Sequence, residues 1–104
     1  MIETLTIAVS GQGLHAITPQ VAAVIERAEI DEGLCTLFIQ HTSASLLIQE
    51  NYDPTAADDL QRWFNRLVPE GDPLYRHTME GRDDMPAHIK SALTATSIAI
   101  PIIS

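Results

Sequence analysis

Four histidines give this sequence its main potential for chemistry: His15, His41, His77 and His88. Imidazole is the commonest side-chain ligand for zinc-like metals, and it carries protons near neutral pH. His41 ends an apolar run, His77 lies in a glycine-containing stretch, and His88 stands near the start of a helical pattern. Strand ends, loops and helix starts can meet at one mouth of an α/β sheet. These three side chains could therefore meet, and three imidazoles with one open position would make a catalytic metal site. Alternatively each histidine only hydrogen-bonds a backbone group, because the spacing matches no short zinc motif.

Several carboxylates follow His41 closely. Glu50 comes directly after an apolar stretch and could act as a general base or a metal ligand. Glu50 and His41 are therefore the expected catalytic residues. Asp53 precedes a proline, which favours a role as a helix N-cap. Asp58 and Asp59 would lie in the first turns of that helix, where the dipole favours negative charge, or simply on a solvated face.

Hydroxyl side chains and nearby cations could bind an anion. Thr42, Ser43 and Ser45 could cradle a phosphate through hydroxyl and backbone N–H groups. The same residue types also make ordinary turns. Arg76 and Lys90 each lie within two residues of a histidine, so they are the expected anion partners. Exposed surface cations with no such role are the alternative.

Four apolar stretches predict β-strands, at residues 5–9, 34–40, 46–49 and 98–103. The first alternates apolar with small or polar residues, as a half-buried strand does. The second is apolar on both faces, which predicts an interior strand. It should form a hairpin with the third, with His41–Ser45 in the loop. Pro101 predicts an edge or a bulge in the last strand, which has no strand after it to pair with.

Three helical patterns separate these strands. The first has Thr18 as its expected N-cap and Pro19 at its first position. The second follows Asp53 and has an expected buried stripe of Ala56, Leu60, Trp63, Phe64 and Leu67. The third covers about Pro86–Ala95, with Ile89, Ala92 and Leu93 expected to face inward. A long loop, Val68–Asp84, precedes it. Interleaved strands and helices predict an α/β (or α+β) class with a mixed sheet.

Composition limits the partners. The chain has 104 residues, which predicts a single domain over residues 1–104. Its net charge of −8, with six lysines and arginines, argues against nucleic acid and against an anionic membrane surface. No apolar run approaches the roughly 20 residues of a membrane span. The first residues lack the basic region of a signal peptide, and a lone cysteine, Cys35, suits a reducing cytoplasm.

Four motifs together resemble the YjbQ-like family: "HTSASLLIQENYDP", "YRHTMEG", "PAHIKSAL" and "IAIPI". Better-studied members are described as secondary thiamine-phosphate synthases. The resemblance implies a compact fold with a mixed, barrel-like sheet, and a homotrimer. It also implies histidines at the positions of His41, His77 and His88, which makes a three-histidine metal site the expected one. It implies acids at the positions of Glu50, Asp53 and Asp59, while His15 has no counterpart. The family continues past "IPI" for about another strand pair, so the domain is expected to be incomplete at its C-terminus.

The resemblance implies a transferase that joins a pyrimidine pyrophosphate to a thiazole phosphate. Its phosphorylated small-molecule substrates would need a divalent cation at the leaving pyrophosphate. Glu50 could hold Mg²⁺, while Arg76, Lys90 and the Thr42–Ser45 turn could bind phosphate. Three histidines suit a softer, zinc-like metal better than Mg²⁺, so this synthesis is expected to be a side activity. The alternatives are a metal-assisted hydrolase of a small metabolite and a non-catalytic trimer that binds a metal or ligand.

Overall fold

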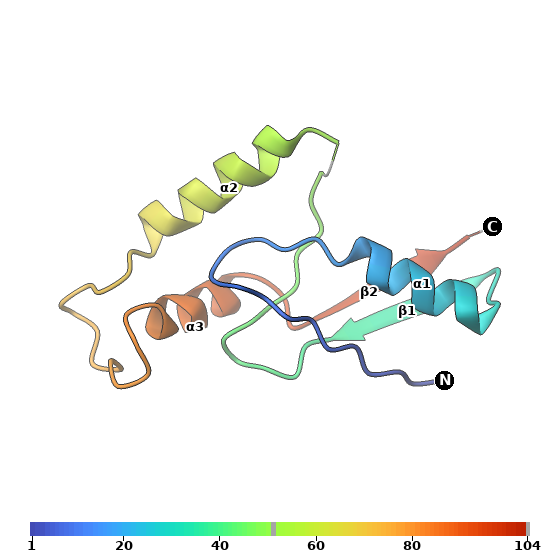
Figure 1. The fold of residues 1–104 in the computed structure, drawn as a ribbon, viewed down its shortest axis with the longest axis horizontal. Helices are drawn as coiled ribbons and strands as arrows, with labels where there is room; N and C mark the ends of the chain where they lie inside the picture. Colours follow the sequence, from blue (N-terminus) through green and yellow to red (C-terminus); the bar gives the residue numbers. More distant parts are fainter. Residues whose placement is uncertain (51, 104) are drawn as a thin grey trace. The chain divides into compact units, whose positions relative to one another are not determined.

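The computed structural model describes residues 1–50 and 52–103, so Asn51 and Ser104 lie outside the described residues. Within that part of the chain the elements follow in the order α1 (Thr18–Ala28), β1 (Gly33–Phe38), α2 (Pro54–Leu67), α3 (Asp84–Leu93) and β2 (Ser97–Ile102). β1 and β2 pair with each other and run in opposite directions (Figure 1). The domain is therefore of the α+β class, with three helices and a two-stranded antiparallel sheet. No helix among the described residues has the length and apolar character of a membrane span.

The expected mixed, barrel-like sheet is wrong, because two antiparallel strands cannot close into a barrel. Residues 5–9 alternate as expected but form no strand. Residues 46–49 also form none, and only Leu46 makes an isolated antiparallel bridge, to Ala95. The expected hairpin does not form, because the backbone groups of Ile39 and Leu46 pair with residues 95–96 and not with each other's segments. The N–H of Ile39 donates to the Thr96 carbonyl (2.8 Å), and that of Leu46 donates to the Ala95 carbonyl (2.7 Å).

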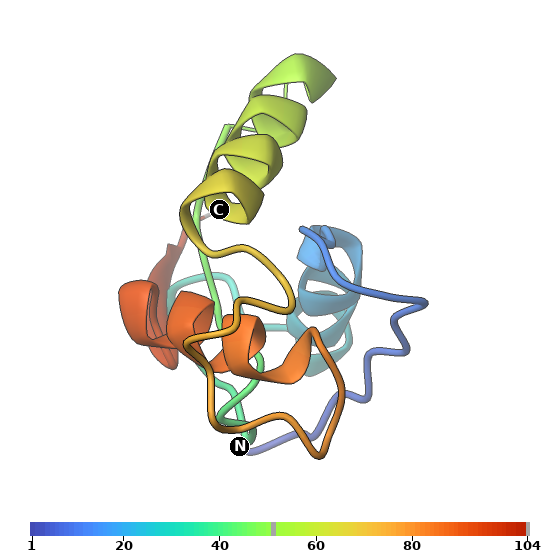
Figure 2. The same cartoon turned by 90° about the vertical axis from the view of Figure 1, so that its left-hand side faces the viewer.

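The chain groups into two compact units, one of Met1–Cys35 with the residues from Ala99 onward, and one of Thr36–Ile98. The second unit contains every residue of the candidate site described below. In it, the loop of residues 68–83 leads from the end of α2 to the start of α3 (Figure 2). The expected long loop is therefore confirmed.

Hydrogen bonds anchor α3 to the turn that follows β1. The Ser91 hydroxyl donates to the Ala44 carbonyl (3.2 Å), and the Thr94 hydroxyl donates to the Ser45 hydroxyl (2.5 Å). Ser91 is buried, so its donor needs this partner. These bonds fix which face of α3 meets the turn. They thereby help to place His88 of α3 against the Thr42 carbonyl in the same turn.

Several apolar side chains expected to be buried are exposed. Trp63 and Leu67 on α2 and Leu93 on α3 are 48–56% exposed, and Ala92 is exposed as well. The expected interior strand is also wrong, because β1 has one partner strand and Phe38 is 69% exposed. An amphipathic stripe is typical of a helix that packs against a partner. Here Trp63 contacts Phe64 on the same helix edge to face, and these apolar side chains stay about half exposed.

The two proline-led helices begin differently. Thr18 is the first residue of α1 rather than its cap, because the N-cap position falls on Ile17 and has no side-chain hydrogen bond. Asp53 caps α2 as expected: its carboxylate accepts from the Thr55 N–H (2.9 Å) and the Thr55 hydroxyl (2.8 Å). The backbone bond to Thr55 lowers the pKa of Asp53 below its ordinary value of 3.8.

Replacing Asp53 by alanine should lower the melting temperature of the protein by a few degrees, because the Thr55 N–H loses its acceptor. Asp53→Asn retains an acceptor and should lose less. A lowered pKa means that the charged cap stabilises the fold above the ordinary pKa, and that this contribution disappears as the pH falls through the lowered one. Thermal melts from pH 7 to pH 2 should therefore show the difference between wild type and Asp53→Ala shrinking with acid. A difference that grows with acid would contradict the assignment.

Candidate metal centre

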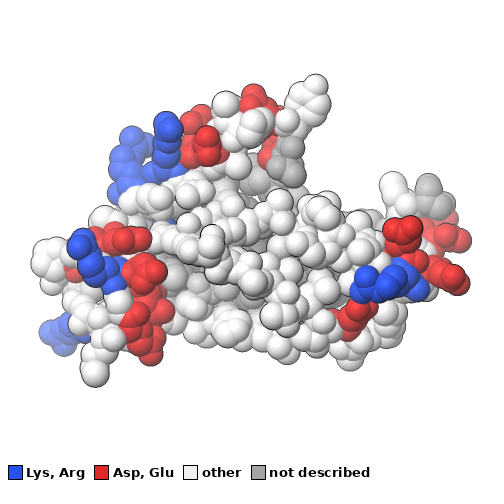
Figure 3. All heavy atoms as spheres, in the orientation of Figure 1, with Lys and Arg blue, Asp and Glu red and all other residues white. Residues whose placement is uncertain are grey.

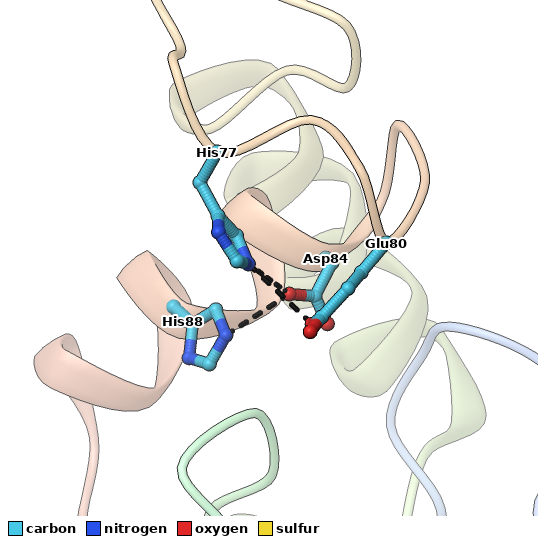
Figure 4. A group of neighbouring side chains, drawn as sticks. All are labelled: His77, Glu80, Asp84 and His88. Atoms are coloured by element: carbon cyan, nitrogen blue, oxygen red, sulfur yellow. Dashed lines mark hydrogen bonds and ion pairs between the residues drawn. The ribbon is translucent and has the colours of Figure 1, made fainter.

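His77, Glu80, Asp84 and His88 each offer one ligand atom, and these four atoms all lie within 4.8 Å of one another. Both imidazole rings point at the Asp84 carboxylate, with the Glu80 carboxylate beside it (Figure 4). Asp84 Oδ2 lies 2.7 Å from His77 Nε2 and 3.0 Å from His88 Nε2, and Glu80 Oε2 lies 3.5 Å from His77 Nε2. Ligand atoms around a tetrahedral zinc are about 3.4 Å apart, given zinc–ligand bonds of about 2.1 Å. The group therefore has the dimensions of a metal's coordination sphere.

Two elements supply these side chains. Asp84 and His88 lie four residues apart on α3, so they project from the same face of the helix. His77 and Glu80 come from the end of the preceding loop. A turn there brings them together: the Gly81 N–H donates to the Thr78 carbonyl (3.2 Å), and Gly81 has a φ of 110°, which side chains disfavour.

The partners of His88 indicate which ring nitrogen carries its hydrogen. Its Nδ1 lies 3.2 Å from the Thr42 carbonyl oxygen, which can only accept, so Nδ1 carries the proton. In the neutral ring Nε2 then presents a lone pair to Asp84 Oδ2 at 3.0 Å. Two acceptors at that distance repel unless a proton or a cation lies between them. A ring N–H held by a backbone carbonyl, which leaves the other nitrogen for the metal, is the usual support of a metal-binding histidine.

Hydrogen bonding shifts two pKa values in this cluster. The hydrogen bond that His77 donates to Asp84, with a smaller effect of the Glu80 charge, raises the pKa of His77 above 6.5. The hydrogen bond from His77 lowers the pKa of Asp84 below 3.8. Between these two pKa values the pair is ionised. A divalent cation would therefore have to displace the His77 proton, and its binding should weaken as the pH falls through the raised pKa.

The structure brings together two of the three expected histidines, since His77 and His88 have ring centroids 5.4 Å apart. His41 is exposed and is not one of the four clustered residues, but it immediately precedes Thr42, whose carbonyl meets His88. Glu50 is exposed and also lies outside this cluster. The roles predicted for His41 and Glu50 stay predictions.

Sequence reasoning missed Glu80 and Asp84 as partners of the histidines. The signal was present in "HTMEGRDDMPAH", where the four residues follow one another at intervals of three, four and four. Such intervals place side chains on one face wherever the backbone is helical or turns tightly. His15, in contrast, donates to the Gly11 carbonyl (3.0 Å), which is the backbone role considered for every histidine.

The residues expected to bind phosphate have varied surroundings. The Thr42 carbonyl accepts from His88 on α3, and the Ser45 hydroxyl accepts from Thr94, which directly follows α3. Ser43 is exposed in the same turn. Arg76 is exposed. Lys90 donates to Asn65 Oδ1 (2.7 Å), and burial lowers the pKa of its amine. Asp58 and Asp59 lie exposed on α2, which fits the solvated face considered for them.

This α+β chain, with its histidine–carboxylate cluster, belongs to the family described as UPF0047 protein YjbQ-like, whose model matches residues 3–104. A UPF0047 protein of Synechocystis sp. is 53% identical over 98% of the chain and 69% of its own length. The UPF0047 protein YjbQ of Escherichia coli O157:H7 is 42% identical over 96% of the chain and 72% of its own. A crystal structure of a conserved hypothetical protein from Thermus thermophilus superposes with a TM-score of 0.73 at 38% identity. That match covers 85% of this chain and 65% of the other, just under two thirds of its length.

Proposed function

We propose that this protein is a metal-dependent enzyme acting on a small phosphorylated substrate, and that His77, Asp84 and His88 hold a zinc-like divalent cation. One observation carries the proposal: His88 commits its N–H to the Thr42 carbonyl and turns its other nitrogen to Asp84 at 3.0 Å. Two imidazoles and one carboxylate are a common ligand set for catalytic zinc and for non-haem iron.

A cation held there would supply Lewis-acid stabilisation of negative charge on a phosphoryl or carbonyl oxygen. The chain's own residues would do the rest. Asp84 would balance the charge and keep both imidazoles oriented. Glu80 has the most exposed side chain of the four, at 65%, and can reach a substrate in solution. We assign Glu80 the role of proton acceptor, for water or for a substrate group.

The particular reaction we propose to test first is the one implied by the resemblance, in which a thiazole phosphate displaces pyrophosphate from a pyrimidine. The cluster supports this choice, because a cation held by its residues would stabilise the negative charge of the leaving pyrophosphate. A histidine-bearing site also suits metal-assisted hydrolysis of a small metabolite, which we keep as the second candidate because the ligand set is that of zinc hydrolases. We further propose a cytoplasmic homotrimer. The many exposed apolar side chains, among them Leu34, Phe38 and Trp63, support association.

Metal titration tests the proposal. The purified chain, stripped with chelator, should take up one zinc per chain by equilibrium dialysis and elemental analysis, and should bind Mg²⁺ far more weakly. Light scattering on the same sample gives the oligomeric mass. Pyrophosphate release from the two phosphorylated precursors then separates an enzyme from a protein that only binds metal. Zinc uptake below one tenth of an equivalent at micromolar concentrations would refute the proposal, whatever the turnover.

A further inference from the structure

A pocket of about 380 Å³ lies in the loop that contributes His77 and Glu80 to the candidate metal centre. It is lined by residues 71–73, Tyr75, His77, Thr78, Gly81 and Arg82. Its volume is in the lower range of pockets that bind small molecules. His77 belongs both to this pocket and to the metal-binding cluster, so a ligand in the pocket would lie next to the cation.

The walls of this pocket are held by the loop's own hydrogen bonds. The Tyr75 hydroxyl donates to the Pro69 carbonyl (2.9 Å), and the Gly71 N–H donates to the Arg82 carbonyl (3.2 Å). Asp72 is the carboxylate among the lining residues, and its Oδ1 accepts from the Leu74 N–H (2.9 Å). Hydrogen bonds within the loop therefore shape the pocket, and the Asp72 carboxylate is engaged with the backbone.

Arg82 supplies the positive charge among the residues that line this pocket. Its guanidinium lies on the backbone of Gly71, where an added Cβ would stand 2.6 Å from both Nε and Nη2. A glycine at this position, with a φ of 64°, therefore makes room for the guanidinium. Within residues 1–50 and 52–103 the Arg82 side chain makes no hydrogen bond or ion pair, whereas Arg27 pairs with Glu3 at 2.6 Å.

The pocket's chemistry matches a phosphoryl group. A guanidinium presents paired N–H donors that fit two phosphate oxygens at once. Acidic side chains lie close by, and Figure 3 shows acidic and basic side chains intermixed over this part of the chain. The carboxylates of Glu80 and Asp84 would repel an anion unless a divalent cation balanced them.

We infer that the pocket of residues 71–82 binds the phosphoryl end of the substrate through Arg82, and that it does so when the neighbouring cluster holds its cation. The inference deepens the proposed function and rests on it for the coupling to metal. It makes Arg82 a substrate-binding residue that sequence reasoning did not single out, in place of Arg76, which does not line the pocket.

Inorganic pyrophosphate is the probe, titrated calorimetrically into the full chain with and without one bound zinc, and the zinc content is measured again afterwards. Arg82→Gln should bind pyrophosphate about tenfold or more weakly, because one charge-assisted pair is lost. Arg66→Gln, on the last turn of α2, should stay within about twofold as a matched control. Zinc affinity should be the same in all three proteins.

A second variant guards against an effect of charge alone. Gly71→Asn keeps a residue that tolerates positive φ, but its Cβ displaces the guanidinium, so it should weaken pyrophosphate binding while Arg82 is still present. Equal pyrophosphate affinity in wild type and Arg82→Gln, or no binding to the zinc-loaded chain, overturns the inference and leaves the metal proposal intact. Failure to bind zinc refutes the proposed function. In that case, pyrophosphate binding that still depends on Arg82 supports the pocket but overturns its coupling to the cation, and no binding overturns the pocket as well.

Discussion

Asp84→Asn is expected to weaken zinc binding by about 100-fold or more while the chain stays folded. Oδ2 of Asp84 contacts both clustered imidazoles, at 2.7 Å from His77 and 3.0 Å from His88. The amide of asparagine keeps the shape but removes the negative charge that balances a cation. Competition with a chromophoric chelator measures the affinity, and circular dichroism checks the fold.

The neighbouring residue offers a matched control for this change. Asp83 precedes Asp84 and makes no ion pair with either clustered histidine among the described residues. Asp83→Asn removes the same charge one residue away, so it should change zinc affinity only slightly. Equal losses in the two variants would mean that zinc responds to the general negative charge of the segment, and not to a ligand at Asp84.

Glu80→Gln should lower turnover by about 100-fold while zinc stays bound, because the amide cannot take a proton. Glu80 Oε2 lies 3.5 Å from His77 Nε2, which is a looser contact than either made by Asp84. An exposed carboxylate beside the cluster can accept a proton from the substrate or from water, and it need not be a ligand of the cation. The assay is pyrophosphate release under conditions where the zinc content is one per chain.

Glu50→Gln belongs in the same experiment, because the sequence alone pointed to Glu50 as the proton acceptor. The geometry favours Glu80, so we expect the Glu80 variant to lose more activity than the Glu50 variant. The reverse order, with zinc content unchanged in both, would return the catalytic role to Glu50. A loss of zinc from Glu80→Gln would make Glu80 a ligand and contradict its assignment as proton acceptor.

Local sequence chemistry predicted part of the local structure. The Asp53 cap and its proline located the start of α2, because a capping bond joins residues two apart. Two of the four predicted strands, at residues 34–40 and 98–103, were also close to β1 and β2. The pairing of these strands was not predictable in the same way. It depends on residues 95–96 reaching the turn after β1, a contact that no local pattern encodes.

The candidate site was predicted in part for the same reason. His77 and His88 were singled out by residue type, and the fold brings their rings together. Asp84 was interpreted only as the end of a loop. It lies one turn before His88 on α3, so its carboxylate faces Nε2 of that histidine. The direction of the His41 side chain depends on the turn that joins β1 to the following segment, and the sequence contains no regular pattern there from which it could be derived.

Anomalous diffraction at the zinc edge from crystals of the zinc-loaded protein tests the central claim most directly. We expect one strong peak per chain, about 2.1 Å from Nε2 of His77, Nε2 of His88 and a carboxylate oxygen of Asp84. The Nδ1 of His88 should remain on the Thr42 carbonyl. A zinc peak held by other residues, or crystals grown with zinc that show no peak at this cluster, would contradict the account.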